Sequence, residues 1–377
     1  MRLLYLTDNV YLHGGFEKIL IQKVNYWAEV YGYDIVLGLT NQEGKPPFVP
    51  ISEKVRVHDF GLEYPGESVF NPKNFGLFKQ QYKKLKALID EFKPDAIFVL
   101  TQRLFHIITP FAAGKIPTYF EYHTSYYGFE LGNARLSFPQ RAKNSIIDFA
   151  KQLAENRYTK IVYLNQAEFD HYKRKNSVII PNFYNVIEKQ SGENRKNIAI
   201  SLGRLSFQKG YDLLIETWAK LDQKIENWEM HVYGNGENRE ALAEQLSKHD
   251  FKNPFHFFEA TDVIDEKLSE ASIYVMSSRF ETFPMVLLEA MSHALPIVSF
   301  DCPTGPASIS TNGKDGILVR PDDVSELANG LQKLIENPDL RREMGSAGEI
   351  LVKRFSPQIV MKQWDDLIKT QVFKAKS

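Results

Sequence analysis

Residues 277–306, with the sequence SSRFETFPMVLLEAMSHALPIVSFDCPTGP, contain the pattern that decides the fold. An apolar run ends just before them at Met276, and a loop then carries Glu281. Pro284 can open a helix, because its fixed φ suits the first positions of a helix. A second apolar run, Ile297–Phe300, follows that helix. The order strand, loop, helix and strand predicts a βα unit of a parallel sheet.

The same alternation of short apolar runs and longer amphipathic segments extends through the whole chain. The predicted strands are residues 3–6, 35–39, 55–60, 96–100, 118–122, 161–164 and 178–180 in the first half, and 198–202, 229–233, 255–258, 273–276, 297–300 and 317–319 in the second. Each half therefore has enough strands for a doubly wound sheet of its own. We predict an α/β protein with two Rossmann-like domains.

The domain boundaries follow from composition. The polar stretch 181–197 is rich in Asn and predicts a linker, so we place an N-terminal domain at 1–185 and a C-terminal domain at 186–355. Ser356 and Pro357 predict the start of a last helix, because they suit the N-cap and the first helical position. Residues 356–377 form this helix, and the sequence leaves open whether it packs back on the N-terminal domain.

The net charge of −1 hides an asymmetry between the halves. Residues 1–185 contain 23 basic and 18 acidic side chains, a net charge of +5, and residues 186–377 contain 23 and 29, a net charge of −6. With 25% charged and 43% hydrophobic residues, the chain is not of a disordered class. One cysteine, Cys302, excludes an internal disulfide and favours a reducing compartment. No signal peptide and no apolar run of membrane-spanning length is found, so we expect a cytoplasmic protein whose membrane contact is at most peripheral.

Nucleotide-binding motifs of two common kinds are absent from the chain. Neither G-x-G-x-x-G nor G-x-x-x-x-G-K-[ST] occurs, which disfavours redox enzymes and P-loop NTPases. The segment GRLSFQKG at 203–210 instead places Arg204 and Lys209 on one loop, before a helix that starts near Tyr211. Two cations beside a helix N-terminus suit a diphosphate. The alternative is that both are solvated loop charges, which is common for single Arg and Lys residues.

A pair of carboxylates lies further along the chain. Glu281 and Glu289 flank the predicted helix entry, and both can accept hydrogen bonds from the hydroxyl groups of a sugar or ribose. The backbone N–H groups of Thr282 and Phe283 are expected to point the same way. The alternative for an isolated pair of this kind is one helix-capping Glu and one surface Glu.

Together, GRLSFQKG, ETFPMVLLEAMSHALPIV and DCPTGPASISTNGKDGILVRPDD resemble the retaining glycosyltransferases of family 4 (glycosyl transferases group 1), which have the GT-B fold of two Rossmann-like domains facing across a cleft. The resemblance covers residues 198–355. It implies that Glu289 binds the ribose hydroxyls of the nucleotide and that Glu281 contacts the donor sugar. It also implies that Arg204 and Lys209 bind the diphosphate, while the first domain binds the acceptor.

The resemblance also implies a reaction. The expected enzyme transfers a sugar with retention, from a nucleotide-sugar to a glycan or a lipid-diphosphate-linked acceptor. The segment DCPTGP, with Gly305, resembles members that use UDP-sugars to build surface polysaccharides or lipid-linked glycans, so the expected donor is a UDP-sugar. The chain has no Asp-x-Asp motif, and two cations can replace a metal at the diphosphate. We predict no metal requirement and no cofactor besides the nucleotide-sugar co-substrate.

Two features of the first half extend this expected site. Gly14 and Gly15 follow the first strand, where bare backbone can approach a phosphate. An ordinary βα turn is the alternative. His123 comes directly after the strand 118–122, although a lone His is more often packed or on the surface. The resemblance implies that the glycines close over the donor diphosphate and that His123 lies beside the donor sugar.

Residues 75–92, FGLFKQQYKKLKALIDEF, predict an amphipathic helix. An apolar stripe runs along it, and Lys79, Lys83 and Lys86 form a basic stripe on its flank. The alternatives are a core-packing helix with a solvated edge and a helix that contacts an anionic membrane or a lipid-diphosphate acceptor. Nucleic acid is not an expected partner, because the chain has no recognisable binding module.

Two rival functions stay open on the sequence. A nucleotide-sugar epimerase of the same fold would change the sugar without an acceptor. A catalytically inactive nucleotide-sugar-binding subunit would keep the fold and lose its ligands, against which the presence of Glu281, Glu289, Arg204 and Lys209 argues.

Overall fold

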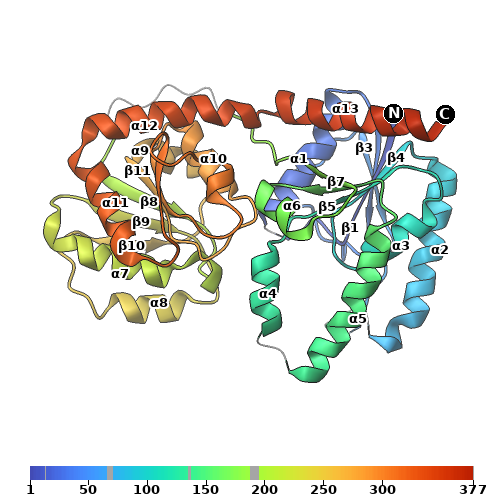
Figure 1. Cartoon of the computed structure of the whole chain (residues 1–377), viewed down its shortest axis with the longest axis horizontal. Coiled ribbons are helices and arrows are strands. Elements are labelled where there is room, and N and C mark those ends of the chain that lie inside the picture. Colours follow the sequence, from blue (N-terminus) through green and yellow to red (C-terminus); the bar gives the residue numbers. More distant parts are fainter. Residues whose placement is uncertain (13, 66–70, 135–136, 187–194, 377) are drawn as a thin grey trace. The chain divides into compact units, whose positions relative to one another are not determined.

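The chain forms two α/β units in the computed structural model, which describes residues 1–12, 14–65, 71–134, 137–186 and 195–376 (Figure 1). The first unit contains Met1–Thr124, Phe129–Ile180 and Met361–Ser377. The second contains Ser125–Gly128 and Pro181–Val360. The chain therefore passes from the first unit to the second near residue 181, and most of its last helix belongs to the first unit again.

The first unit is built on a parallel sheet of seven strands in the order β3-β2-β1-β4-β5-β6-β7. Its strands are β1 Arg2–Thr7, β2 Asp34–Leu39, β3 Val55–Asp59, β4 Ala96–Val99, β5 Thr118–Glu121, β6 Lys160–Tyr163 and β7 Ser177–Ile179. The inner strands are buried almost throughout, which explains why they read as continuous apolar runs in the sequence.

The second unit is built on a parallel sheet of six strands in the order β10-β9-β8-β11-β12-β13. Its strands are β8 Ile198–Leu202, β9 Glu229–Tyr233, β10 Phe255–Phe258, β11 Ile273–Met276, β12 Ile297–Phe300 and β13 Gly316–Val319. All thirteen predicted strands are present, within one or two residues at their ends, and the predicted class of two Rossmann-like α/β domains is confirmed.

Helices connect the strands of both sheets. In the first unit these are α1 Gly15–Glu29, α2 Phe75–Phe92, α3 Leu104–Ala112, α5 Phe138–Glu155, α6 Gln166–Tyr172 and all but the first three residues of α4 Tyr126–Ala134. In the second they are α7 Tyr211–Leu221, α8 Arg239–Leu246, α9 Ile264–Glu270, α10 Met285–Ser292, α11 Val324–Glu336 and α12 Pro338–Leu351, and α13 Pro357–Lys376 ends the chain. Short 3-10 turns lie at Pro72–Asn74, Phe207–Lys209, Asp222–Lys224, Pro306–Ser308 and Val352–Phe355. None of the helices, over the residues described, is long and apolar enough to cross a membrane.

The end of α13 packs into the core of the first unit. Trp364 is 1% exposed, and its ring lies edge-on to Phe98 and Tyr119 at centroid distances of 5.8 and 6.3 Å. Tyr33 donates a hydrogen bond to Asp365 Oδ1. A buried Trp of this kind contributes several kcal/mol to stability, about 3 to 5 in typical truncations. The last helix is thus part of the first unit from Met361 onward.

The strand orders locate the places where ligands bind in such sheets. In the first sheet the order turns between β1 and β4, and in the second it turns between β8 and β11. Loops that leave neighbouring strands in opposite directions open a crevice beyond the carboxyl ends of those strands. The two loops with the predicted donor residues follow β8 and β11. They therefore lie at the point where the strand order of the second sheet turns.

Candidate functional site

Two of the donor residues predicted in the second unit, Lys209 and Glu281, meet at the carboxyl ends of β8 and β11. Lys209 Nζ lies 2.7 Å from Glu281 Oε1, and the two side chains are 17% and 8% exposed. Lys209 ends the short turn after β8, and Glu281 stands in the loop between β11 and α10. Two loops 72 residues apart in sequence therefore place one ammonium and one carboxylate in contact. An ion pair in a partly buried position is screened less than one on the surface.

Glycine makes the close approach of the two loops possible. Gly210 has a φ of +63°, and a Cβ on it would lie 2.1 Å from the carbonyl oxygen of Ser277. Ser277 Oγ in turn donates a hydrogen bond to the Lys209 carbonyl over 2.9 Å. No other residue type fits this position without moving the backbone. The last Gly of GRLSFQKG is thus explained by contact with the loop after β11.

Several residues that hold Glu281 in place were missed by sequence reasoning. Ser278 Oγ donates to Glu281 Oε1 over 2.7 Å, and Gln208 Nε2 donates to the Phe280 carbonyl over 3.0 Å. The Thr304 hydroxyl donates to the carbonyl of Glu281. Small polar residues beside a predicted carboxylate are a weak signal, and here only the folded loops show that these three support it.

The other predicted donor residues differ in their surroundings. Arg204 is exposed on the loop after β8, whereas Phe283 is 7% exposed and packs edge-on against Phe355 at 5.6 Å. Glu289 lies on α10 and is half-buried, as is Thr282 in the loop before that helix. Burial raises the pKa of Tyr184 above its ordinary value, and the negative charge of Glu289 adds to this effect. Phe283 is therefore a packing side chain, and only its backbone N–H stays a candidate for ligand contact.

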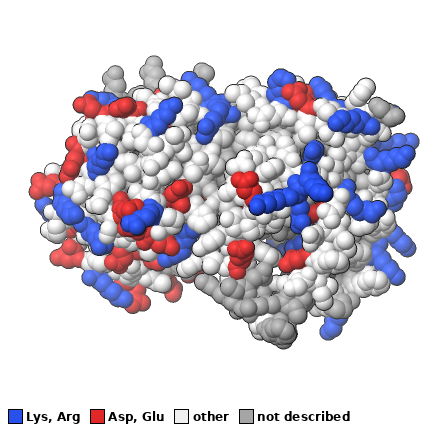
Figure 2. All heavy atoms as spheres, viewed as in Figure 1, with Lys and Arg blue, Asp and Glu red and all other residues white. Residues whose placement is uncertain are grey.

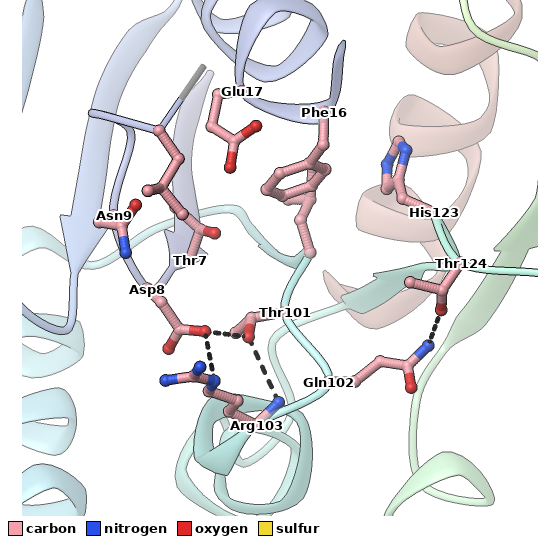
Figure 3. A pocket seen from close by; sticks show the side chains of 12 residues that line it. Thr7, Asp8, Asn9, Phe16, Glu17, Thr101, Gln102, Arg103, His123 and Thr124 are labelled. Carbon is pink, nitrogen blue, oxygen red and sulfur yellow. Dashed lines mark hydrogen bonds and ion pairs between the residues drawn. The ribbon is translucent and has the colours of Figure 1, made fainter. Parts of the chain in front are cut away.

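A cavity of about 350 Å³ opens at the corresponding position of the first unit (Figure 3). It lies beyond the ends of β1, β4 and β5. Its lining residues are Thr7, Asp8, Asn9, Leu12, Phe16, Glu17, Leu100, Thr101, Gln102, Arg103, His123 and Thr124. Most of these side chains were not predicted, because they come from three separate strand ends that carry no recognisable motif.

A polar network covers one wall of this cavity (Figure 3). Thr101 donates a hydrogen bond to Asp8 Oδ2, and Thr40 donates to Asp8 Oδ1 over 3.1 Å. Arg103 Nε lies 3.5 Å from Asp8 Oδ2, and its side chain is 61% exposed. Asp8 is thus held in one orientation from three sides, while the Arg103 guanidinium keeps access to water. Such a wall can bind hydroxyl groups and an anion together.

Gly14 and Gly15 lie between β1 and α1, where the helix begins at Gly15. Gly14 is the residue before the helix, and its neighbours Phe16 and Glu17 line the cavity. A Cβ on Gly14 would lie 2.3 Å from Glu17 Oε2, so the Glu17 carboxylate folds back against bare backbone. Glu17 is 9% exposed. The contact of these glycines with a donor diphosphate stays a prediction.

His123 lines the cavity, and its ring is fixed from two sides. The Phe16 ring meets it edge-on at a centroid distance of 5.1 Å (Figure 3). On the other side, His123 Nε2 lies 3.5 Å from Glu121 Oε2. Lys23 Nζ is 2.6 Å from the same carboxylate oxygen. Burial alone would raise the pKa of Glu121, but the positive charge of Lys23 and the contact with His123 hold this pKa below its ordinary value.

The basic residues predicted on α2 are exposed. Lys79, Lys83 and Lys86 all face water; Lys79 Nζ lies 4.9 Å from the centroid of the Phe75 ring, and Lys86 pairs with Asp90 at 3.0 Å. The apolar stripe of α2 is buried in the second half of the helix and exposed at its start. Leu85, Ile89 and Phe92 are buried in the core, whereas Phe75 at the start of the helix is 62% exposed. In the view of Figure 2, Lys and Arg side chains border the first unit, and both signs of charge mix over the second. The core-packing interpretation of α2 therefore holds for its second half.

One group among the described residues could hold a metal ion. Glu229 and His231 on β9 and His256 on β10 offer ligand atoms that lie within 4.8 Å of one another. His231 and His256 are paired in register across the two strands. These residues lie within the sheet at β9 and β10, whereas the donor loops follow the carboxyl ends of β8 and β11. This group is therefore not part of the donor arrangement.

Comparison with known proteins places the second unit in a family. Residues 184–350 match the model of the family described as glycosyl transferases group 1, and this region contains Arg204, Lys209, Glu281 and Glu289. This match agrees with the resemblance to glycosyl transferases group 1 seen in the motifs, while membership of family 4 and the retaining mechanism stay predictions.

Similar proteins extend the comparison to the whole chain. An uncharacterized glycosyltransferase of Haemophilus influenzae is 26% identical over 374 residues, which cover 97% of this chain and 99% of the relative. The amylovoran biosynthesis glycosyltransferase AmsD of Erwinia amylovora is 29% identical over 174 residues, 46% of this chain and 48% of AmsD. These findings support a glycosyltransferase. The retaining mechanism and the donor stay predictions.

Solved structures share the fold. The lipopolysaccharide outer core galactosyltransferase WaaB has a TM-score of 0.76 at 16% identity, with 98% of this chain and 100% of WaaB covered. Anabaena HepE, solved in complex with UDP, has a TM-score of 0.78 at 18% identity, with 98% and 100% covered. The GT-B fold expected from the motifs is therefore confirmed.

Proposed function

We propose that this glycosyltransferase transfers a sugar from a UDP-sugar, with retention and without a metal, to a glycan or lipid-linked acceptor in polysaccharide or glycoconjugate biosynthesis. The observation that carries this proposal is the Lys209–Glu281 pair at the switch between β8 and β11, inside the family domain. UDP is the nucleotide bound in the similar HepE structure, and AmsD acts in amylovoran biosynthesis according to its name.

The donor residues have separate roles in this proposal. Lys209 and the exposed Arg204 bind the diphosphate, whose negative charge grows as the sugar leaves. Glu281 holds the Lys209 ammonium in place before the donor binds, because the pair is already formed at 2.7 Å. Glu281 also accepts a hydrogen bond from a sugar hydroxyl, and Glu289 accepts hydrogen bonds from the ribose. A preformed cation costs no reorganisation when charge develops.

The cavity of the first unit receives the acceptor end of the reaction. Asp8 accepts hydrogen bonds from sugar hydroxyls, and Arg103 binds an acidic or phosphate group of the acceptor. His123 contacts the sugar that is transferred. The donor residues belong to the second unit and His123 to the first.

The proposed step conserves the configuration of the sugar. The bond from the anomeric carbon to the diphosphate oxygen breaks, and the acceptor hydroxyl oxygen forms a new bond on the same face. The leaving phosphate oxygen takes the proton of that hydroxyl. This route needs no enzymatic nucleophile, and the cations of the donor site stabilise the leaving group without a metal.

The enzyme is proposed to bind its acceptor at a membrane surface. Helix α5 exposes Ile146, Phe149 and Leu153 at 72%, 62% and 50%, with spacings of three and four residues. An exposed apolar helix face with basic residues elsewhere on the same unit suits the surface of an anionic membrane. Flotation with phosphatidylglycerol vesicles tests this membrane contact. The Phe149→Ser variant should float with the vesicles in a smaller fraction than the wild type. Equal binding of the wild type to neutral vesicles would contradict the role of charge.

The transfer itself is tested by acceptor-dependent release of UDP. The chain is incubated with UDP-glucose, UDP-galactose or UDP-N-acetylglucosamine, with and without polyprenyl-diphosphate-linked sugar acceptors, and UDP and product linkage are measured. Release that depends on the acceptor, with an α-linkage kept from the donor, supports the proposal. Conversion of one UDP-sugar into another without acceptor would identify an epimerase. Binding of UDP-sugar without any turnover would identify an inactive subunit.

A further inference from the structure

The carboxylate of Glu121 is buried inside the sheet of the first unit. Glu121 ends β5, an inner strand, and is 1% exposed. A buried charge is costly unless it is paired. Its partner is Lys23 from α1, whose Nζ lies 2.6 Å from Oε2 and whose side chain is 6% exposed. A strand and a helix 98 residues apart in sequence thus enclose one ion pair.

A third segment closes this ion pair off. Lys23 Nζ lies 3.8 Å from the centroid of the Trp364 ring on α13. Trp364 is 1% exposed, so the ammonium is covered by indole on one side and faces the carboxylate on another. The contact is a cation–π interaction, which is strongest when the cation is desolvated. The last helix of the chain therefore holds Lys23 against Glu121.

Stability alone does not explain a pair of this kind. A buried ion pair is often no more stabilising than apolar residues of the same volume, because both charges lose their hydration. The pair also contacts a residue that lines the cavity, because Glu121 Oε2 lies 3.5 Å from a ring nitrogen of His123. The carboxylate therefore acts on the side chain that it contacts at the cavity.

That group is His123. Glu121 Oε2 lies 3.5 Å from His123 Nε2, and among the described residues neither Nε2 nor the second oxygen, Oε1, has a hydrogen-bond partner. The Phe16 ring lies against the imidazole at 5.1 Å, and His123 itself lines the cavity (Figure 3). The imidazole thus has a carboxylate at one nitrogen, an aromatic ring at its edge and the cavity beside it.

We propose that Glu121 is the positioning residue for His123, and that Lys23 keeps this carboxylate charged. The carboxylate favours the tautomer with hydrogen on Nε2, so Nδ1 is the nitrogen that accepts a hydrogen bond from a substrate hydroxyl. Buried carboxylates orient imidazoles in this way in other kinds of site. The inference rests on the proposed function, in which His123 contacts the transferred sugar.

A neutral pair separates positioning from packing. The double variant Lys23→Met/Glu121→Leu keeps the volume and removes both charges, so its melting temperature should stay close to that of the wild type or exceed it. Its kcat should fall about 30-fold, with the KM for the UDP-sugar changed by no more than about 3-fold. A stable double variant with wild-type kcat would overturn the inference.

A second carboxylate serves as the matched control. Glu155 is 2% exposed and pairs with Arg174 at 2.7 Å, and it is not a lining residue of the cavity. Glu155→Gln and Glu121→Gln should both lower the melting temperature, because each leaves a cation without its charge partner. Only Glu121→Gln should lower kcat of the folded enzyme. Equal kcat losses in both variants would mean that the effect is structural.

The tautomer of His123 gives a readout that does not depend on turnover. Two-bond ¹H–¹⁵N correlations of its ring, assigned with a His123→Gln variant, should show hydrogen on Nε2 in the wild type above pH 8. The double variant should show a mixture of both tautomers. A mixture already in the wild type would overturn the inference even if transfer is observed. A wild type with this tautomer but without transfer would contradict the proposed function alone.

Discussion

The donor loops of the second unit and the cavity of the first unit occupy the same place in two similar sheets, yet they are built differently. The donor loops carry their charged residues within two short stretches, 203–210 and 281–289. The cavity collects single residues from the ends of β1, β4 and β5 and the start of α1. A site made of two loops keeps its spacing in the sequence, whereas a site made of strand ends depends on the strand order. The residues of the first kind can therefore be found in the sequence as motifs, whereas of the residues that line the cavity only His123 was predicted.

The largest effect is expected from a substitution in the donor loops. Lys209→Ala should lower kcat/KM for UDP-sugar by about 10²- to 10³-fold, because the leaving diphosphate loses a preorganised cation. The thermal shift produced by UDP should disappear as well, since that shift reports binding to the folded state. Lys196→Ala, which removes an exposed ion pair with Glu270 in the same unit, is the control and should leave both quantities unchanged.

The first unit is tested by a change with a smaller expected effect. His123→Ala should lower kcat by about 100-fold, because a group in contact with the transferred sugar is lost. The UDP-induced rise in melting temperature should stay, since UDP binds to the second unit in this proposal. Loss of that thermal shift in His123→Ala would show that the two sites are not separable in this way.

Acid should weaken the first unit. Burial lowers the pKa of His106, although the nearby Glu155 carboxylate acts in the opposite direction. Below about pH 6.5 the imidazole therefore binds a proton in the unfolded chain but stays neutral in the folded chain. Stability should therefore fall as the pH decreases below 6.5. The pKa of Glu155 is also lowered. Burial would raise it, but the contacts with His106, Tyr122 and Arg174 outweigh burial. The ionised Glu155 therefore contributes to the stability of the fold above about pH 4.5, and this contribution is lost below that pH.

The measurement is the melting temperature between pH 7 and pH 4. His106→Phe should flatten the curve of melting temperature against pH just below pH 6.5. An uncharged Phe ring can stack on Phe120 as His106 does, whose ring centroid lies 3.8 Å from that of Phe120. His249→Gln in the second unit is the control, since His249 pairs with Glu216 near the surface. An identical curve for His106→Phe and the wild type would locate the acid sensitivity elsewhere.

The smallest expected effect concerns metals. Turnover in EDTA should stay within about 1.5-fold of turnover in Mg²⁺, because Lys209 and Arg204 supply the positive charge at the diphosphate. If turnover falls in EDTA, the variants His231→Gln and His256→Gln show whether the group on β9 and β10 is responsible. Retained activity in both variants would then place the metal at the donor itself and would remove the metal-independent mechanism.

Much of the fold could be predicted because it depends on local patterns. Buried parallel strands are continuous apolar runs, so β8 to β12 were located to the residue, and the 75–92 helix has the predicted ends. The Lys209–Glu281 contact was not predicted as a contact, although both residues were, because it requires the loops after β8 and β11 to be neighbours. The order β9-β8-β11 decides that, and no local pattern encodes it.

The sequence by itself determined two Rossmann-like units, the resemblance of the second to glycosyl transferases group 1, and the two loops that carry Arg204, Lys209 and Glu281. Only the tertiary structure decided that Trp364 covers the Lys23–Glu121 ion pair, which contacts His123. It also decided that Asp8 and Arg103 share a cavity wall with Thr101. The physical reason is the range of the interactions involved. Helices, strands and loop motifs arise from neighbours in the chain, whereas a buried ion pair forms between segments that only the packed core brings together.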